Sequence, residues 1–204
     1  CHETYKDDKG KWLSPDQVEN TKTGKKSRID GSKVKVGPSE AMSKSKKNIV
    51  DPESMIKIFG ADAVRWFILS DSPPERDVQW STAGVSAAHK FIQRIWSLNQ
   101  KILNRKKSQI NSEEEKKFAS KFNEYIFKVT DLIENFQLNV AVAKIYEITS
   151  LMENNIAKQI SNQSLIVSQT KFMKMLLPFA PHLSCECLSK LEGKNFYEEI
   201  QWPI

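Results

Sequence analysis

The chain has few cysteines and no long apolar run. Three cysteines in 204 residues do not suggest a disulfide framework, and reduced thiols favour a cytoplasmic protein. No apolar stretch approaches the roughly 18 residues that a membrane-spanning helix needs, so we expect no membrane segment. The chain begins with Cys1, without a methionine or a signal-peptide pattern. We interpret it as a segment of a longer protein.

Acidic residues are outnumbered by basic ones. The 31 Lys and Arg residues against 25 Asp and Glu give a net charge of +6, and the pI is about 9.1. This balance favours an anionic partner such as nucleic acid or a nucleotide. Hydrophobic residues make up 39% of the chain and the mean hydropathy is −0.51, which predicts a soluble chain. Its length is sufficient for one or two domains with a real core.

Large apolar side chains are sparse over residues 1–50, where Lys, Asp, Gly, Ser and Thr are frequent. The short stretches 11–13 and 33–36 are candidates for strands, because turn signals such as Asp30-Gly31 lie between them. The sequence therefore predicts a small β-rich segment that leads into a loop near residues 37–39.

From Asp51 onward the pattern is helical. Asp51-Pro52-Glu53 is typical of a helix start, because Asp caps the first turn, Pro fits its geometry and Glu favours the positive end of the helix. We expect one helix over about 51–60 and a second over about 61–69.

Apolar residues recur at helical spacing through the rest of the chain. The predicted fold class is therefore mainly α, with a helical bundle preceded by a small β-rich segment and a loop. We divide the chain into domains at residues 1–75 and 76–204. The further helices are predicted over about 88–103, 118–136, 142–156, 163–177 and 181–193.

A lysine- and serine-rich stretch, EAMSKSKKN, occupies residues 40–48. Most stretches of this composition are solvated connections between elements. A phosphate-binding P-loop requires Gly-x4-Gly-Lys-Ser/Thr, and no second glycine lies between Gly37 and Lys44. The P-loop is therefore excluded, and the order of the residues has to be considered instead.

The order Met42-Ser43-Lys44-Ser45 resembles the KMSKS signature of class I aminoacyl-tRNA synthetases. The surrounding sequence makes the match more specific, because it is similar to the leucyl-tRNA synthetase family almost continuously. Enzymes of the same class for valine, isoleucine or methionine are the sibling alternative. The family pattern is found here at Asp51-Pro52, Gly60-Ala61-Asp62 with Arg65, Ser72-Pro73-Pro74, Trp80, Gly84-Val85, 177–182 and 201–203.

The resemblance implies a fold and a set of substrates. The bundle would be the anticodon-binding domain of a class I synthetase, and the loop would end its nucleotide-binding fold. A leucine-specific insertion would occupy the interval from about residue 6 to residue 35. The intact enzyme would use ATP, with Mg²⁺, to activate leucine and transfer it to tRNA(Leu). The leucine pocket would lie outside this segment.

The resemblance also implies roles for the loop residues. Lys44 would be catalytic, because its ammonium would stabilise the charge that develops on the departing pyrophosphate. Met42, Ser43, Lys44 and Ser45 would bind ATP. The first lysine of the signature is Ala41 in this chain, so the catalytic role is assigned to Lys44 alone. Replacement of the missing charge by Lys46 or Lys47 is a hypothesis.

Amino-acid activation in class I enzymes also needs a His-x-Gly-His motif. The three histidines here are His2, His89 and His182, and none lies in such a motif. We therefore expect the isolated segment to have no activation activity. The alternative from a different functional class is a non-catalytic basic helical module that binds RNA, in which Lys44 has no chemical role.

No acidic residue occurs from Ser81 through Asn111. A solvated polar face explains most basic helices, but the absence of counter-charge favours phosphate contacts. Three of the cations share one helix face by their spacing, and the resemblance places the first two at positions that touch tRNA in the family. The residues assigned to tRNA binding are Lys90, Arg94, Lys101 and Arg105, with Lys106 and Lys107 following at the helix end.

Other residues are given structural interpretations. The tryptophans Trp66, Trp80 and Trp96 are predicted to pack in the core rather than to stack on bases. Asp62 and Arg65, three residues apart, are predicted to pair with each other. His89 is predicted to lie on the RNA-facing helix surface, and no metal site is predicted.

Overall fold

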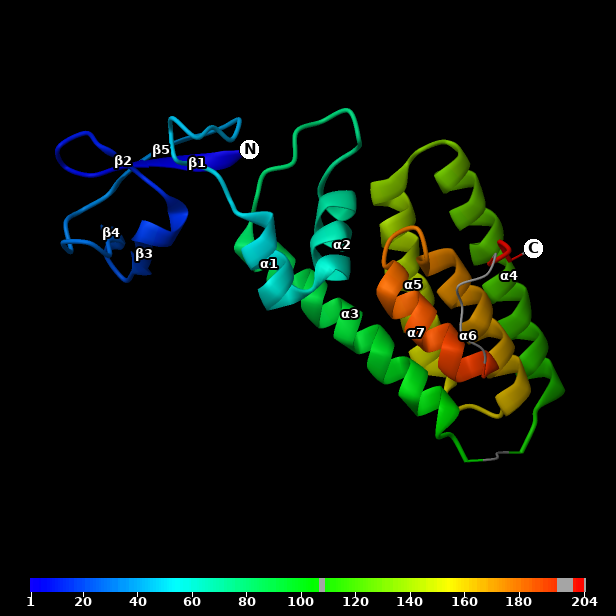
Figure 1. Ribbon diagram of the computed structural model, residues 1–204. Coiled ribbons are helices and arrows are strands. Elements are labelled where there is room, and N and C mark those ends of the chain that lie inside the picture. Colours follow the sequence, from blue (N-terminus) through cyan, green and yellow to red (C-terminus); the bar gives the residue numbers. More distant parts are fainter. Residues whose placement is uncertain (107–108, 194–199, 204) are drawn as a thin grey trace.

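The computed structural model describes residues 1–106, 109–193 and 200–203. These residues form a small β-rich part and a larger helical part, shown at the left and right of Figure 1. The predicted fold class, mainly α with a β-rich segment before a helical bundle, is confirmed. Lys107, one of the predicted basic residues, lies outside the described residues.

The β-rich part contains two small antiparallel sheets. The first strand is the middle strand of a three-stranded sheet, in the order β2-β1-β5, and the other two strands form a hairpin. The strand predicted over 11–13 is confirmed as β2, whereas the one predicted over 33–36 begins only at Lys35. The strands are β1 (His2–Lys6), β2 (Trp12–Leu13), β3 (Val18–Thr21), β4 (Gly24–Ser27) and β5 (Lys35–Glu40), with a 3-10 helix at Pro15–Gln17.

Four of the described helices begin at a side chain that caps them. The carboxylate of Asp51 accepts hydrogen bonds from the backbone N–H groups of Glu53 and Ser54, which confirms the predicted helix start. Ser81, Asn111 and Ser161 cap three of the later helices in the same way. The helices are α1 (Pro52–Phe59), α2 (Ala61–Asp71), α3 (Thr82–Leu103), α4 (Ser112–Glu134), α5 (Leu138–Asn155), α6 (Asn162–Leu176) and α7 (Pro181–Glu192).

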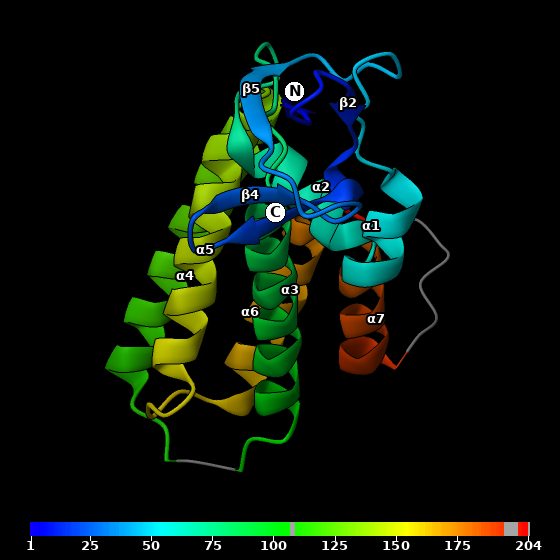
Figure 2. The same ribbon diagram turned by 90° about the vertical axis from the view of Figure 1, so that its left-hand side faces the viewer.

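The helices are arranged so that α1 and α2 bridge the two parts. In Figure 1 they lie between the strands and the helices α4 to α7, and α3 runs from one group to the other. Figure 2 shows the long helices running roughly in one direction, with the β-rich part at one end. The loop over residues 41–50 joins β5 to α1, so it is held between the small sheet and the first helix.

Trp66 is the centre of an aromatic cluster that joins α2 to the bundle. Its side chain is fully buried, and its ring lies 5.0 Å from Phe91, 5.7 Å from Tyr146 and 6.1 Å from Phe179, measured between ring centroids. Trp80 and Trp96 are partly buried against the same core, so the structural interpretation of the three tryptophans is confirmed. The core thus continues across residue 75, and the division of the chain at that residue stays a prediction.

Asp62 and Arg65 do not pair with each other, so that prediction is wrong. The buried Asp62 carboxylate accepts hydrogen bonds from the backbone N–H of Leu183, at 2.7 Å, and of His182, at 3.3 Å, and lies 2.8 Å from His182 Nδ1. The Arg65 guanidinium donates to the carbonyl oxygen of Pro178 at 2.7 Å. Both side chains bind the junction of α6 and α7, a distant segment that the local sequence did not reveal.

Replacing Asp62 with alanine is expected to lower the free energy of unfolding by about 1–2 kcal/mol, because the first turn of α7 loses its acceptor. Urea unfolding followed by circular dichroism would measure this change. Asp8→Ala, at an exposed turn position, is the matched control and should leave stability unchanged. Equal stability of the two variants would show that Asp62 does not hold α7.

Candidate functional site

The loop over residues 41–50 is anchored by one buried side chain. Asn48 has no exposed surface. Its Oδ1 accepts a hydrogen bond from the backbone N–H of Ser43 at 2.8 Å, and its Nδ2 lies 3.3–3.4 Å from the carbonyl oxygens of His2, Glu40 and Ala41. The two ends of the loop are therefore joined to each other and to β1.

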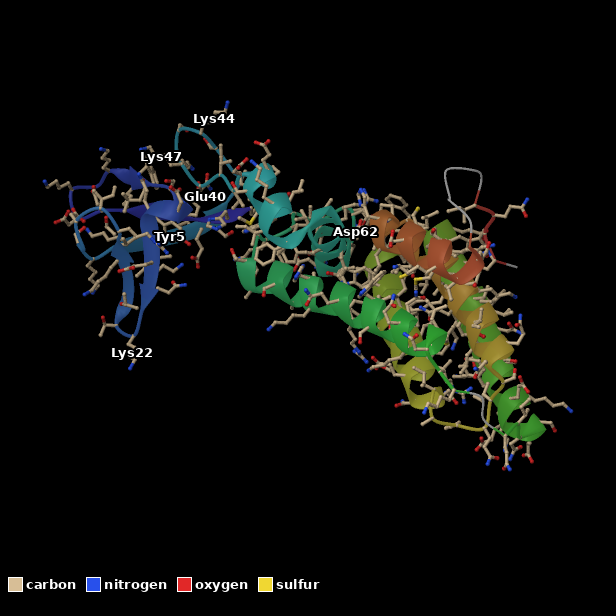
Figure 3. The ribbon with its side chains drawn as sticks, turned by 60° about the horizontal axis from the view of Figure 1, so that its bottom comes forward. Tyr5, Lys22, Glu40, Lys44, Lys47 and Asp62 are labelled. Atoms are coloured by element: carbon tan, nitrogen blue, oxygen red, sulfur yellow. The ribbon has the colours of Figure 1, made fainter. Side chains whose placement is uncertain are left out.

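Lys44 lies at the exposed outer end of this loop. Figure 3 shows its side chain pointing away from the rest of the molecule. Among the described residues, no hydrogen bond or ion pair holds its ammonium. The hydroxyl groups of Ser43 and Ser45 lie 2.7 Å apart beside it. The predicted catalytic lysine is thus available to an anion in solution, next to two hydroxyl groups that can donate hydrogen bonds.

The two lysines that follow are placed differently. The ammonium of Lys46 forms an ion pair with the carboxylate of Glu40, directly before Ala41. Lys47 is exposed and has a φ of +54°, a left-handed conformation that is uncommon for residues other than glycine. Lys46 would have to exchange Glu40 for an anion before it could replace the charge missing at Ala41.

Arg94 of α3 has a counter-charge that its own helix lacks. Its Nε and Nη2 donate to the two carboxylate oxygens of Glu153 on α5, at 2.9 and 2.5 Å, and Nη2 also lies 3.3 Å from the Ser150 hydroxyl. These hydrogen bonds hold the pKa of the Glu153 carboxyl below its ordinary value. Arg94 is therefore paired, although α3 itself contains no acidic residue.

Arg105 follows the end of α3 and binds the connection between α5 and α6. Its guanidinium donates to the carbonyl oxygens of Ile156 at 2.6 Å, Lys158 at 2.6 Å and Ile160 at 2.8 Å. It also donates to the side-chain oxygen of Asn162 at 2.5 Å. This half-buried arrangement supports a structural role for Arg105, and its assignment to tRNA binding stays a prediction.

Lys90 and Lys101 are exposed cations of α3, like Arg94, but no ion pair among the described residues holds them. Eleven residues separate them, about three helical turns, so their side chains emerge on the same face as Arg94. The structure therefore brings together Lys90, Arg94 and Lys101 on one surface of α3. His89, beside them, has Nδ1 2.8 Å from the carbonyl oxygen of Phe59 and so links α3 to the end of α1.

Replacing Lys90 or Lys101 with alanine is expected to weaken tRNA binding by the full-length protein and to reduce the slope of log Kd against log salt concentration by about one. The reason is that each exposed lysine on this face would release one counterion from a phosphate. Filter binding at several salt concentrations measures both effects. Lys57→Ala, at an exposed position of α1, is a control, and an unchanged slope in all three variants would contradict phosphate contacts by α3.

A groove of about 1000 Å³ lies between the start of α2, α3 and α7, and no residue of the loop over 41–50 lines it. Phe59, Trp96, His182 and Cys185 contribute to its lining.

No group of three or more His, Cys, Asp or Glu side chains that could hold a metal ion occurs within the described ranges. No helix among the described residues is long and apolar enough to cross a membrane.

Two family models match the chain. The model described as "tRNA synthetases class I (I, L, M and V)" matches residues 34–81, which contain the loop with Lys44 and the helices α1 and α2. The model described as "Anticodon-binding domain of tRNA ligase" matches residues 115–204, which contain most of α4 and all of α5 to α7.

Curated relatives match the chain over its length. The leucine–tRNA ligase of Bartonella henselae is 39% identical over 216 residues, which cover 100% of this chain and 24% of the relative. That of Maricaulis maris is 37% identical over 211 residues, 99% of this chain and 24% of the relative. The chain is homologous to a segment of leucine–tRNA ligase. It spans about a quarter of the length of these relatives.

A solved structure extends the leucine–tRNA ligase relationship to the fold. It is the crystal structure of a ternary complex of LeuRS, tRNA and LeuAMS from Agrobacterium radiobacter K84, with a TM-score of 0.66 and 30% sequence identity. The match covers 74% of this chain and 20% of that chain. The resemblance to the leucyl-tRNA synthetase family, predicted from the residues of the loop and the helices, is thus confirmed.

Three residues that hold the loop or pair with the α3 surface were not predicted from the sequence: Asn48, Glu40 and Glu153. Asn48 belongs to the quoted stretch, but nothing in a lysine-rich sequence indicates that its last residue is buried. Glu153 lies 59 residues from Arg94, and His2, which ties Asn48 to β1, lies 46 residues from Asn48. Only the fold brings them into contact.

Proposed function

We propose that the chain is the part of a leucine–tRNA ligase that supplies the ATP-facing loop and the tRNA-contacting bundle. The observation that carries this proposal is the solvent-directed ammonium of Lys44 on an anchored loop with the KMSKS-like order. The homology of the whole chain to leucine–tRNA ligases supports it. We further propose that the full-length protein acts in the cytoplasm.

The proposed chemistry is the attack of the leucine carboxylate on the α-phosphate of ATP. Negative charge then grows on the leaving pyrophosphate, and Lys44 stabilises that charge more strongly in the transition state than in bound ATP. The hydroxyl groups of Ser43 and Ser45 donate to phosphate oxygens, and Met42 shapes the loop. Mg²⁺ is proposed to accompany the triphosphate, which is its usual ligand, and no described residue is assigned to it.

The bundle is proposed to position tRNA(Leu) through phosphate contacts. Lys90 and Lys101 are exposed and require no rearrangement, whereas Arg94 would have to leave Glu153 or bind RNA with the groups that remain free. Contacts of this kind fix the orientation of an RNA without reading its sequence. The division at residue 75 would then separate the ATP-facing part from the tRNA-facing part.

The deciding experiment is amino-acid-dependent ATP–pyrophosphate exchange by the full-length protein, measured with leucine, isoleucine, valine and methionine. Exchange with leucine alone is the expected result. Exchange with another amino acid would keep the chemistry and assign a different substrate. No exchange with any of them would favour the second candidate, a basic helical module that binds RNA without catalysis, for which the basic surface of α3 is the supporting observation.

The isolated chain is expected to show no leucine-dependent exchange, because none of its histidines lies in the His-x-Gly-His motif of the activation site. The full-length protein at the same concentration is the positive control. Measurable exchange by the isolated chain would overturn the proposal that the leucine pocket lies outside this segment.

A further inference from the structure

We infer that Asn48 is a positioning residue for the activation reaction, because it holds the loop in the shape that aims Lys44 at the triphosphate. The inference rests on the proposed function and assigns the loop's geometry to a residue outside the Met42–Ser45 signature. Asn48 is fully buried at the base of a loop whose other polar side chains reach solvent. A buried polar group has to be hydrogen-bonded, and its partners are therefore fixed.

Both the oxygen and the nitrogen of the Asn48 amide have hydrogen-bond partners. Its oxygen accepts from the backbone N–H of Ser43, inside the signature, at 2.8 Å. Its nitrogen faces three carbonyl oxygens at 3.3–3.4 Å: that of Ala41 at the start of the loop, that of Glu40 at the end of β5, and that of His2 on β1. An amide has one acceptor and two donors, so among common side chains only Asn or a longer amide offers this set.

The geometry connects these bonds to Lys44. Ser43 immediately precedes Lys44, and the N–H of Lys47 donates back to the carbonyl oxygen of Lys44 at 3.3 Å, which closes the turn. The ion pair of Lys46 with Glu40 fixes the other side of the same turn. Without Asn48, the segment with Lys44 would be connected to the sheet by the chain and by the half-buried ion pair of Lys46 with Glu40. An ion pair that still reaches solvent contributes little.

The decisive variant is Asn48→Asp in the full-length protein. Aspartate has the same shape, but its ionised form places an oxygen where the donor was, against three carbonyl oxygens. We expect exchange to fall by about 10–100-fold near neutral pH, because small misplacements of a reacting group have effects of that size. The decrease should appear mainly in kcat, since the loop is proposed to act in the transition state.

The pH dependence of this variant tests the donor role directly. Burial and the facing carbonyl oxygens raise the pKa of the introduced carboxyl, so its neutral form is present at lower pH. That form has an O–H donor and a carbonyl acceptor, as the amide does. The exchange of Asn48→Asp relative to the unaltered protein should therefore increase as the pH is lowered from about 8 to about 6.

Other groups near the loop also change their protonation between about pH 6 and about pH 8. Dividing the exchange rate of Asn48→Asp by that of the unaltered protein at each pH removes the effect of these groups, because both proteins contain them. Asn123→Asp, the same change at an exposed position of α4, is the matched control and should show a flat ratio. The titratable side chains on the elements that Asn48 contacts are His2, Glu3, Tyr5 and Lys6 of β1, Lys35 and Glu40 of β5, and Lys44, Lys46 and Lys47 of the loop.

A second measurement does not depend on catalysis. Trypsin cleaves after lysine, and the loop offers Lys44, Lys46 and Lys47. Asn48→Ala and Asn48→Asp should increase the rate of cleavage within the loop of the full-length protein by several-fold, while cleavage elsewhere stays unchanged. Peptide mass spectrometry identifies the sites.

The outcomes separate the inference from the proposed function. Faster loop cleavage together with a pH-dependent loss of exchange supports the inference. Exchange within two-fold of the unaltered protein, a loss that does not recover at low pH, or unchanged loop cleavage would overturn it. If the protein shows no exchange or Lys44→Ala has no effect, the proposed function fails, and the cleavage rate still decides whether Asn48 anchors the loop.

Discussion

Replacing Lys44 with alanine in the full-length protein is expected to lower leucine-dependent ATP–pyrophosphate exchange by about 10²–10³-fold. The ammonium of Lys44 is exposed, and no described residue binds it, so it loses no internal partner when it moves to a phosphate. Its removal would leave the charge on the leaving pyrophosphate without its donor. The decrease should appear in kcat more than in the KM for ATP, because the interaction strengthens as the reaction proceeds.

Two variants make the Lys44 result specific. Lys22→Ala removes another exposed lysine, at the turn of the β3–β4 hairpin and far from the loop (Figure 3), and should leave exchange unchanged. Lys46→Ala tests the charge missing at Ala41: a decrease close to that of Lys44→Ala would show that Lys46 leaves Glu40 for the triphosphate. Unchanged exchange in Lys44→Ala would remove the catalytic role from the loop.

Replacing Trp66 with alanine is expected to lower the free energy of unfolding by about 3–5 kcal/mol, the usual range for a fully buried aromatic residue. The ring contacts aromatic side chains of α3 and α5 and of the segment before α7, and its Nε1 donates to the hydroxyl of Tyr146 at 3.1 Å. Its removal would leave a cavity at the point where α2 meets the bundle. Urea unfolding of the chain, followed by circular dichroism, measures the loss.

The controls for Trp66 are a smaller change and a neighbouring position. Trp66→Phe keeps most of the apolar contact and loses the hydrogen bond, so we expect about 1–2 kcal/mol. Ile68→Ala, on the same helix with 44% of the residue exposed, should cost about 0.5 kcal/mol. If Trp66→Ala destabilised the chain no more than Ile68→Ala does, α2 would not be part of the bundle core.

Local patterns predicted the helices and the order of the two parts. The start of α1 could be predicted because Asp51 caps the N–H groups of residues two and three positions away. The burial of Trp66 was predicted as well, because a large aromatic side chain is usually buried to a large extent. Such features depend on neighbours within a few residues, and these are visible in the sequence.

Pairs between distant segments could not be predicted. Asp62 and Arg65 have the spacing of a helical ion pair, yet both bind the α6–α7 junction, more than 110 residues away. Arg94 was expected to lack a counter-charge because α3 has no acidic residue, but Glu153 approaches it from α5. The sequence identified which cations could act, and the fold decided which of them already have a partner.

The first residues of the chain support two parts of the molecule at once. The carbonyl oxygen of Cys1 accepts a hydrogen bond from the N–H of Trp80 at 2.8 Å, just before the N-cap of α3, and the next carbonyl, that of His2, faces the Asn48 amide. The base of the loop and the segment before α3 are thus both hydrogen-bonded to the first two residues of the chain. Displacing the whole loop as a rigid body would therefore also disturb the start of α3.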